Sequence, residues 1–257
     1  MDLIADHISH RFGALEVLDD VSFTVGSGEV VAIVGPSGCG KSTLLSILGG
    51  LLRPSQGQAE LRGAPPANSL NPLTFVFQDF ALLPWCTVEA NVEFPLVHTA
   101  LGAGERRAVV GDALRRTGLT DFCGAYPKQL SGGMRQRVGI ARALAVRPAI
   151  LLMDEPLSAL DSQTRELLME DFIGLLADGS MGAVYVTHNL EEAVRLADRI
   201  VVLSRRPGRV RKIVEIPMTR AERGAIDARG RLLALQNDLW SLIREEAIDA
   251  EREVQHA

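Results

Sequence analysis

The chain has 257 residues, which is enough for one large domain or two small ones with a buried core. Its net charge is -5, so the chain lacks the excess of Lys and Arg that DNA- and RNA-binding proteins carry, and we expect no nucleic-acid partner. The 3 cysteines form no CxxC pair, which argues against a zinc site or a disulfide framework and fits a reducing compartment.

In the first third of the chain, short apolar runs alternate with polar turns. Strands are expected at residues 3–9, 18–25, 30–34 and 74–77. The run at 30–34 is rich in β-branched residues and predicts a buried parallel strand, and a helix is expected over 41–52. All apolar runs are much shorter than the roughly 20 residues that cross a bilayer, and no secretion signal opens the chain, so we expect membrane attachment only through another protein.

From about residue 88 to 147 the spacing becomes helical without a clear strand, which predicts an inserted helical subdomain. Beyond it, strand patterns at 149–153, 183–187, 199–204 and 210–216 alternate with helical stretches at 162–177 and 189–197. This alternation predicts an α/β fold with a mostly parallel sheet. We expect a single domain over residues 1–257, closed by an amphipathic helical extension at about 220–250.

A glycine-rich loop joins the predicted strand at 30–34 to the helix after it, and its pattern G-x-x-x-x-G-K-S is that of a phosphate-binding loop. Backbone N–H groups of such a loop surround phosphate oxygens, Lys41 neutralises their charge, and the Ser42 hydroxyl can bind Mg²⁺. The expected nucleotide-binding residues are Gly35, Pro36, Ser37, Gly38, Cys39, Gly40, Lys41, Ser42 and Thr43. Because Cys39 lies at a helix start, we expect its thiolate to be favoured and ATP to protect it from alkylation.

Two carboxylates, Asp154 and Glu155, follow the predicted strand at 149–153. A carboxylate at this edge of a parallel sheet can reach Mg²⁺. In an extended chain the two side chains point in opposite directions, so Asp154 is expected to serve the metal while Glu155 polarises the attacking water.

The segment Ser131, Gly132 and Gly133 resembles the start of a helix. A hydroxyl cap is followed by two glycines that allow close approach of the backbone, and then by a long helical pattern. Such a helix N-terminus can bind the γ-phosphate of a nucleotide.

Together these motifs resemble the ATP-binding cassette (ABC) ATPases over nearly the whole chain. The matching segments are the Walker A loop, Gln78 of the Q-loop, the signature at 130–134, Walker B with Glu155, the D-loop at 158–161 and His188 of the H-loop. The resemblance implies a RecA-like P-loop NTPase core with a mostly parallel sheet, an antiparallel β subdomain and the inserted helical subdomain.

By the same resemblance, ATP and Mg²⁺ are the cofactors, with Lys41, Glu155 and His188 as catalytic residues. The metal residues are then Ser42, Gln78 and Asp154. Gln78 senses the metal and the partner subunit, His188 contacts the γ-phosphate, and Asp161 communicates across a dimer. Phe12 stands where the family often has a tyrosine that stacks on adenine, and a phenyl ring can still stack.

Subfamily features point to import. Two features resemble those of the ATPase subunits of nitrate, sulfonate and taurine importers. They are Met134, after the signature glycines, and the stretch D-E-P-L-S-A-L-D. The implied activity is hydrolysis of ATP to ADP and phosphate, coupled to uptake of a small solute at the cytoplasmic face of the inner membrane. The implied partners are a second copy in a head-to-tail dimer, integral membrane permease subunits and, indirectly, a solute-binding protein. The apolar stretch at 82–85 suggests a groove for a permease helix.

Three other functions share the phosphate loop. A soluble ABC ATPase of nucleic-acid repair or translation usually carries a long coiled coil or tandem cassettes, and the sequence shows neither. A small-molecule kinase needs an acceptor site and has no use for the segment from Ser131 to Gly133. A cassette that senses without turnover fits poorly with an intact Glu155 and His188.

Overall fold

The computed structural model describes residues 1–158, 160–177, 179–225 and 227–254. Within these residues a central sheet has the strand order β5-β6-β7-β3-β8-β9. Its strands are β3 (Val30–Val34), β5 (Leu73–Val76), β6 (Ile150–Asp154), β7 (Gly182–Val186), β8 (Arg199–Leu203) and β9 (Val210–Glu215). All neighbours are parallel except β8 and β9, which pair antiparallel, so the mostly parallel α/β core is confirmed.

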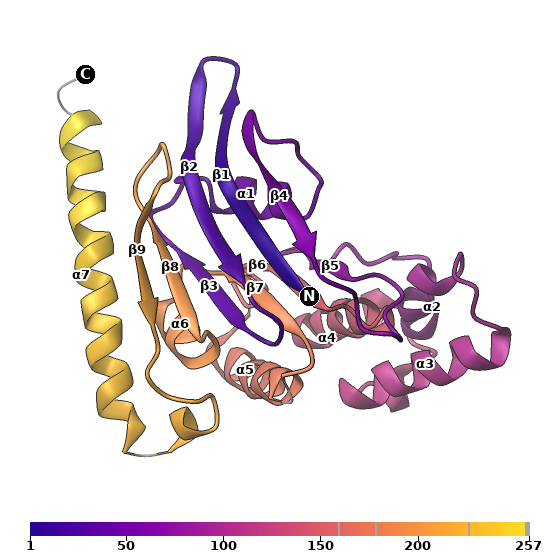
Figure 1. The fold of residues 1–257 in the computed structure, drawn as a ribbon. Helices are drawn as coiled ribbons and strands as arrows, with labels where there is room; N and C mark the ends of the chain where they lie inside the picture. Colours follow the sequence, from indigo (N-terminus) through magenta and orange to yellow (C-terminus); the bar gives the residue numbers. More distant parts are fainter. Residues whose placement is uncertain (159, 178, 226, 255–257) are drawn as a thin grey trace.

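A second, antiparallel sheet lies against the first, with strand order β2-β1-β4. It is formed by β1 (Asp2–Phe12), β2 (Leu15–Val25) and β4 (Gln56–Arg62). Between the two sheets, helix α1 (Lys41–Leu48) and apolar residues of both sheets form one continuous core (Figure 1). This is the antiparallel β subdomain that the family resemblance implies.

Residues 88–147, all of which the structure describes, contain helices and no strand. They form α2 (Val88–Glu93), η1 (Phe94–Leu96), α3 (Ala103–Arg116), η2 (Thr120–Phe122), η3 (Pro127–Gln129) and α4 (Gly132–Ala145). These helices project to one side of the body in Figure 1 and enclose an apolar cluster of their own. The insertion therefore has the helical character that its spacing predicts.

Helices α5 (Ser162–Leu176), α6 (Leu190–Leu196), η4 (Glu222–Gly224) and α7 (Ala228–Val254) complete the fold. Helices α5, α6 and α7 share an apolar cluster with the central sheet, and α7 runs along its β9 side (Figure 1). Of the predicted C-terminal extension, residue 226 lies outside the described part of the chain. No described helix combines the length and the apolar composition needed to cross a membrane.

Candidate functional site

The glycine-rich loop runs from the end of β3 into α1 and borders an open cleft of about 350 Å³. Gly40 is the N-cap of α1 with φ 104°, a value that favours glycine, and a Cβ there would lie 2.8 Å from Leu18 Cδ2. Lys41 is almost buried, and its Nζ donates to the carbonyl oxygens of Gly35 and Pro36, each at 2.9 Å. The cleft is lined by Val17, Ser37, Gly38, Gly40, Lys41, Ser42, Thr43 and Glu155. The structure thus brings most of the predicted phosphate-binding residues together.

Ser42, which lines the cleft, contacts Asp154. The Ser42 hydroxyl, at the start of α1, donates to Asp154 Oδ1 at 3.1 Å, at the end of β6. Burial raises the pKa of Asp154, the hydrogen bond from Ser42 opposes the rise, and the charge of Glu155 adds to it. A hydroxyl and a carboxylate side by side are the hard oxygen donors that Mg²⁺ prefers, so these residues fit the metal.

Gln78 follows β5, the edge neighbour of β6 in the central sheet. Its Nε2 donates to the Ser158 hydroxyl at 3.3 Å, and that hydroxyl in turn donates to the Glu155 carbonyl at 2.9 Å. The structure therefore connects Gln78 to the segment after Glu155.

Glu155 and His188 come together from the ends of the neighbouring strands β6 and β7. His188 Nδ1 lies 3.0 Å from Glu155 Oε2, and the Glu155 N–H donates to the Val186 carbonyl at 2.9 Å. The expectation that Glu155 continues an extended chain is wrong, because its φ is 43°. In this left-handed conformation the backbone leaves the line of the strand, and a non-glycine residue pays a steric cost there.

The segment of Ser131, Gly132 and Gly133 lies apart from the residues that line the cleft. Ser131 caps α4, and its hydroxyl accepts the Met134 N–H at 3.3 Å. A Cβ at Gly133 would lie only 2.5 Å from Cγ2 of Thr164, so this glycine allows α4 to pack against the start of α5.

Asp161 caps α5. Its carboxylate accepts the N–H groups of Gln163 and Thr164 and the Thr164 hydroxyl, the last at 2.7 Å. The bonds from Thr164 hold the pKa of Asp161 below its usual value. Ala159, in the predicted D-loop, lies outside the described residues.

Phe12 ends β1 in the antiparallel sheet and is 52% exposed, so it is not an ordinary core residue. The ring of His10 contacts it edge-on, with centroids 4.6 Å apart. Residue Val17 of the neighbouring strand β2 lines the phosphate-loop cleft, which leaves an exposed aromatic ring on the sheet that borders the cleft.

The expected reactivity of Cys39 is wrong. Its side chain is buried, and this burial raises the pKa of the thiol despite the nearby Lys41 charge and backbone N–H groups. A helix start favours a thiolate only where solvent or a cation compensates the cost of burying the charge.

The sequence did not reveal Glu192, a buried carboxylate on α6 that contacts Tyr185, Thr187 and Arg165. In a helical pattern it looks like one of several surface acids. The one feature of the sequence that could have indicated its burial is its position on the same face of the helix as the apolar residues Ala193 and Leu196.

Comparison with known proteins agrees with this geometry. Residues 18–158 match the family model described as "ABC transporter". A putative ATP-binding protein, BruAb2_1123 of Brucella abortus biovar 1 (strain 9-941), is 38% identical over 252 residues, covering 98% of this chain and 96% of that protein. The taurine import ATP-binding protein TauB of Burkholderia pseudomallei (strain 1710b) is 48% identical over 200 residues, covering 78% of this chain and 77% of that protein.

A solved structure is similar as well. It is the dimeric, post-hydrolysis state of the ATP-binding cassette MJ0796 bound to ADP and Pi. The TM-score is 0.72 with 34% sequence identity, over 84% of this chain and 100% of that one.

Proposed function

This chain belongs to the ABC transporter family, and on that premise we propose that it couples ATP hydrolysis to the import of a small solute of the nitrate, sulfonate or taurine class. The observation that carries the proposal is the Glu155–His188 contact beside the phosphate loop. The nucleic-acid alternative is not favoured, because the similar proteins include an import ATPase.

In the proposed site, ATP binds in the cleft that the phosphate loop, Val17 of β2 and Glu155 line. The exposed ring of Phe12 stacks on the base, and the loop from Gly35 to Thr43 surrounds the phosphates with N–H groups. Lys41, already held beneath the loop by two carbonyl groups, turns its ammonium toward the β- and γ-phosphates. Ser42 and Asp154 would hold Mg²⁺, which would supply positive charge against the phosphate oxygens.

Hydrolysis requires a water molecule in line with the γ-phosphate. Glu155 borders the cleft and provides a carboxylate that orients this water and accepts its proton. His188, in contact with that carboxylate, is the second group that can reach the γ-phosphate. Gln78 contacts the loop after Glu155 through Ser158, so it is placed to sense this region.

The geometry also supports a head-to-tail dimer. The residues that line the cleft do not include Ser131, Gly132 or Gly133, so the capped start of α4 is free to serve the nucleotide of a second copy. Asp161, at the start of the adjacent α5, then lies where two copies communicate. The similar cassette MJ0796 is itself described as dimeric.

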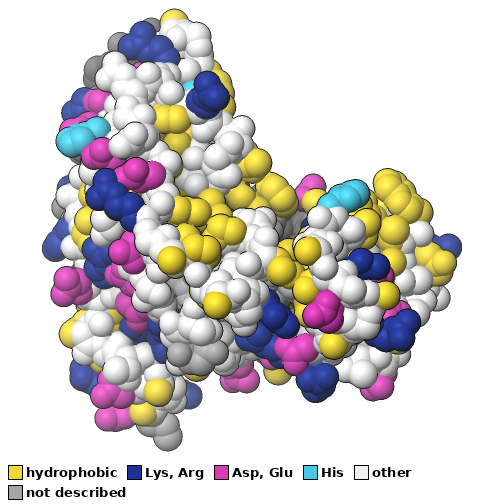
Figure 2. All heavy atoms as spheres, turned by 45° about the vertical axis from the view of Figure 1, so that its right-hand side comes forward, with side chains coloured by type: hydrophobic (Ala, Val, Ile, Leu, Met, Phe, Trp, Pro, Cys, Tyr) yellow, Lys and Arg dark blue, Asp and Glu magenta, His cyan; other side chains and the backbone are white. Residues whose placement is uncertain are grey.

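A permease surface is proposed on the projecting helical subdomain. Exposed apolar residues on it include Phe94 (56% exposed) and Val97 (52%), and Trp85 (72%) lies just before it in the chain. Figure 2 shows hydrophobic side chains gathered on the outer part of this lobe. The buried Asn91 side chain ties the turn around Trp85 to α2 through the backbone of Leu83. A helix of a membrane subunit fits such a surface, which holds the chain at the cytoplasmic face of the membrane and links it indirectly to a solute-binding protein.

The test compares Mg-ATP hydrolysis by wild type, Glu155→Gln and the control Glu215→Gln, with oligomeric state followed by light scattering. Glu215 ends β9 and is exposed away from the cleft lining. We expect Glu155→Gln to lose roughly 100-fold or more in kcat and to form an ATP-dependent dimer, while Glu215→Gln behaves as wild type. Near-normal turnover, or a Glu155→Gln chain that stays monomeric in saturating Mg-ATP, would contradict the proposal. Uptake of labelled taurine, a sulfonate and nitrate by cells expressing the chain with its permease tests the solute class.

A further inference from the structure

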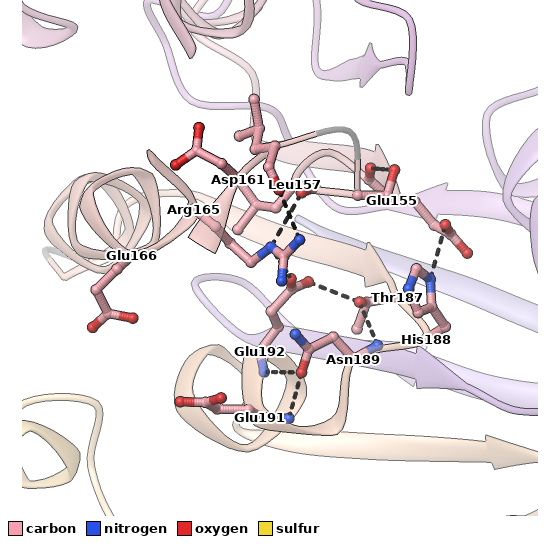
Figure 3. Close-up of polar contacts among 12 residues, drawn as sticks. Glu155, Leu157, Asp161, Arg165, Glu166, Thr187, His188, Asn189, Glu191 and Glu192 are labelled. Carbon is pink, nitrogen blue, oxygen red and sulfur yellow. Dashed lines mark hydrogen bonds and ion pairs between the residues drawn. The ribbon is translucent and has the colours of Figure 1, made fainter. Parts of the chain in front are cut away.

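A buried carboxylate lies beneath the segments that carry Glu155 and His188. Glu192, on α6, is 4% exposed. Its Oε2 accepts the Tyr185 hydroxyl at 2.8 Å and the Thr187 hydroxyl at 2.7 Å. Burial and the Glu192 charge raise the pKa of Tyr185 well above its usual value, so the phenol keeps its proton and remains a donor. The second oxygen, Oε1, lies 3.8 Å from Nε of Arg165 (Figure 3).

Arg165 extends this network to the loop that follows Glu155. From α5, its guanidinium donates to the carbonyl of Leu160 at 2.8 Å and to that of Leu157 at 3.4 Å. These two carbonyls come from the segment that leads to Asp161, the N-cap of α5. Figure 3 shows the Arg165 guanidinium lying between this segment and Glu192.

Thr187 extends the network in the other direction, to His188. Its hydroxyl donates to Glu192 and accepts the Asn189 N–H at 2.9 Å. Asn189 in turn caps α6, accepting the N–H groups of Glu191 and Glu192. The residues on both sides of His188 are therefore fixed by hydrogen bonds that lead back to one carboxylate.

We propose that Glu192, with Arg165 and Thr187, is a positioning residue that couples the loop at 157–161 to His188, so that a displacement of the loop by a partner subunit changes the His188–Glu155 contact. The inference rests on the roles proposed above for Glu155 and His188. A buried charge needs all its partners, since losing one leaves an uncompensated group. A displacement of the loop relative to His188 therefore strains the Arg165–Glu192 ion pair or the buried Thr187–Glu192 hydrogen bond.

The fold offers a matched control one residue along α5. Glu166 accepts from Arg195 at 2.7 Å, so this pair also joins α5 to α6. Its bond lies at the surface and involves neither the 157–161 loop nor Thr187. Glu166→Gln therefore removes an α5–α6 ion pair without touching the proposed coupling.

The experiment measures kcat, KM, nucleotide affinity and Tm of the full chain for Glu192→Gln, Thr187→Val, Thr187→Ser and Glu166→Gln. Glu192→Gln keeps the shape of the side chain but removes its charge, and Thr187→Val removes only the hydroxyl. We expect both to lower kcat about 10- to 100-fold with nearly unchanged nucleotide affinity, because the reacting groups are misplaced rather than lost. Thr187→Ser retains the hydroxyl and should stay within about twofold of wild type, as should Glu166→Gln.

Wild-type kcat in folded Glu192→Gln and Thr187→Val would overturn the proposal. So would a fall in kcat that only parallels a loss of nucleotide affinity or of Tm, because that is the result of a purely structural role. Glu155→Gln, measured in the same assay, distinguishes a failure of the proposed function from a failure of the proposed coupling. If Glu155→Gln still hydrolyses ATP, the proposed function fails; if it is inactive while Glu192→Gln turns over normally, only the coupling fails.

Discussion

His188 Nδ1 contacts Glu155 Oε2 at 3.0 Å although the two residues are 33 positions apart in the chain. Neighbouring parallel strands bring them together, since β6 and β7 pair in register up to Asp154 and Val186. Glu155 then turns out of the strand with φ 43°, a conformation that glycine adopts more easily. The contact thus combines sheet topology with local backbone strain.

The strain at Glu155 predicts an unusual order of stability. Glu155→Gly should be more stable than Glu155→Ala by about 1 kcal/mol, because only glycine accepts this φ without a steric cost. Both variants should lose hydrolysis. Urea unfolding checks the order, and the same pair of substitutions at Glu166, inside α5, is the control, where alanine should be better by roughly 0.5–1 kcal/mol. Equal stability of the two Glu155 variants would show that the backbone there is not strained.

A second prediction concerns Gly133 and Thr164. Gly133→Ala should lower Tm, because its Cβ would meet Thr164 Cγ2 at 2.5 Å. Thr164→Ser removes this methyl group but keeps the hydroxyl bonded to Asp161, so it should restore much of the Tm of Gly133→Ala. Gly132→Ala is the control, since its Cβ has 3.6 Å to Leu160 Cδ2. If Tm does not recover in the Gly133→Ala, Thr164→Ser double variant, the clash with Thr164 is not the cause of the lower Tm.

Cys39 should be the slowest cysteine to alkylate in the native chain. It is buried, whereas Cys86 and Cys123 are partly exposed. Burial raises the Cys39 pKa, so less thiolate is present near neutral pH, and its labelling should increase only as the solution becomes more alkaline. Because the folded chain holds this proton more tightly than the unfolded chain, the protonated thiol adds to the free energy of unfolding. This contribution is complete below the pKa of the thiol in the unfolded chain and is lost as pH rises through its pKa in the folded chain. Peptide mass spectrometry after iodoacetamide treatment gives the rates, and native Cys39 labelling as fast as Cys86 would contradict this.

Trp85 should matter for transport and not for nucleotide chemistry. Trp85→Asp places a charge on the exposed apolar surface beside the helical subdomain, so copurification with the permease should fall about tenfold or more. ATP affinity of the free chain should be unchanged. Leu233→Asp, at a 57% exposed apolar position on α7, is the control and should retain the permease. Equal loss in both variants would point to a general effect of surface charge.

The buried strands were predictable from their residues. For β3, β6, β7 and β8, continuous apolar runs fix the position to within about one residue. The strand β4 was missed because its side chains are mostly polar and many are exposed, so its pairing with β1 was the feature that the sequence did not show. Helix α1 ends at Leu48 rather than near 52, because Gly49 caps it and Gly50 takes the left-handed conformation, with φ 71°.

At the site, motif spacing predicted the phosphate loop and the acidic pair, and the structure places Glu155 with Lys41 at one cleft. Contacts between distant segments were not predictable. Glu192 has the appearance of a surface acid, and nothing in the sequence connects Gly133 with Thr164 across 31 positions. The Cys39 error has the same origin, since a helix start was visible in the sequence but the burial of the thiol was not.

The cleft takes one wall from β2 of the antiparallel sheet, through Val17, and another from the loop after β3 of the parallel sheet. A nucleotide held there therefore links two layers of the fold and binds only the native chain. At ATP concentrations 100-fold above Kd, this linkage adds about 2.7 kcal/mol to the free energy of unfolding. Proteases cut transiently opened chains, so saturating ATP should slow proteolysis of the purified chain. We then expect bound nucleotide to set how long the chain resists cleavage, in addition to its role in turnover.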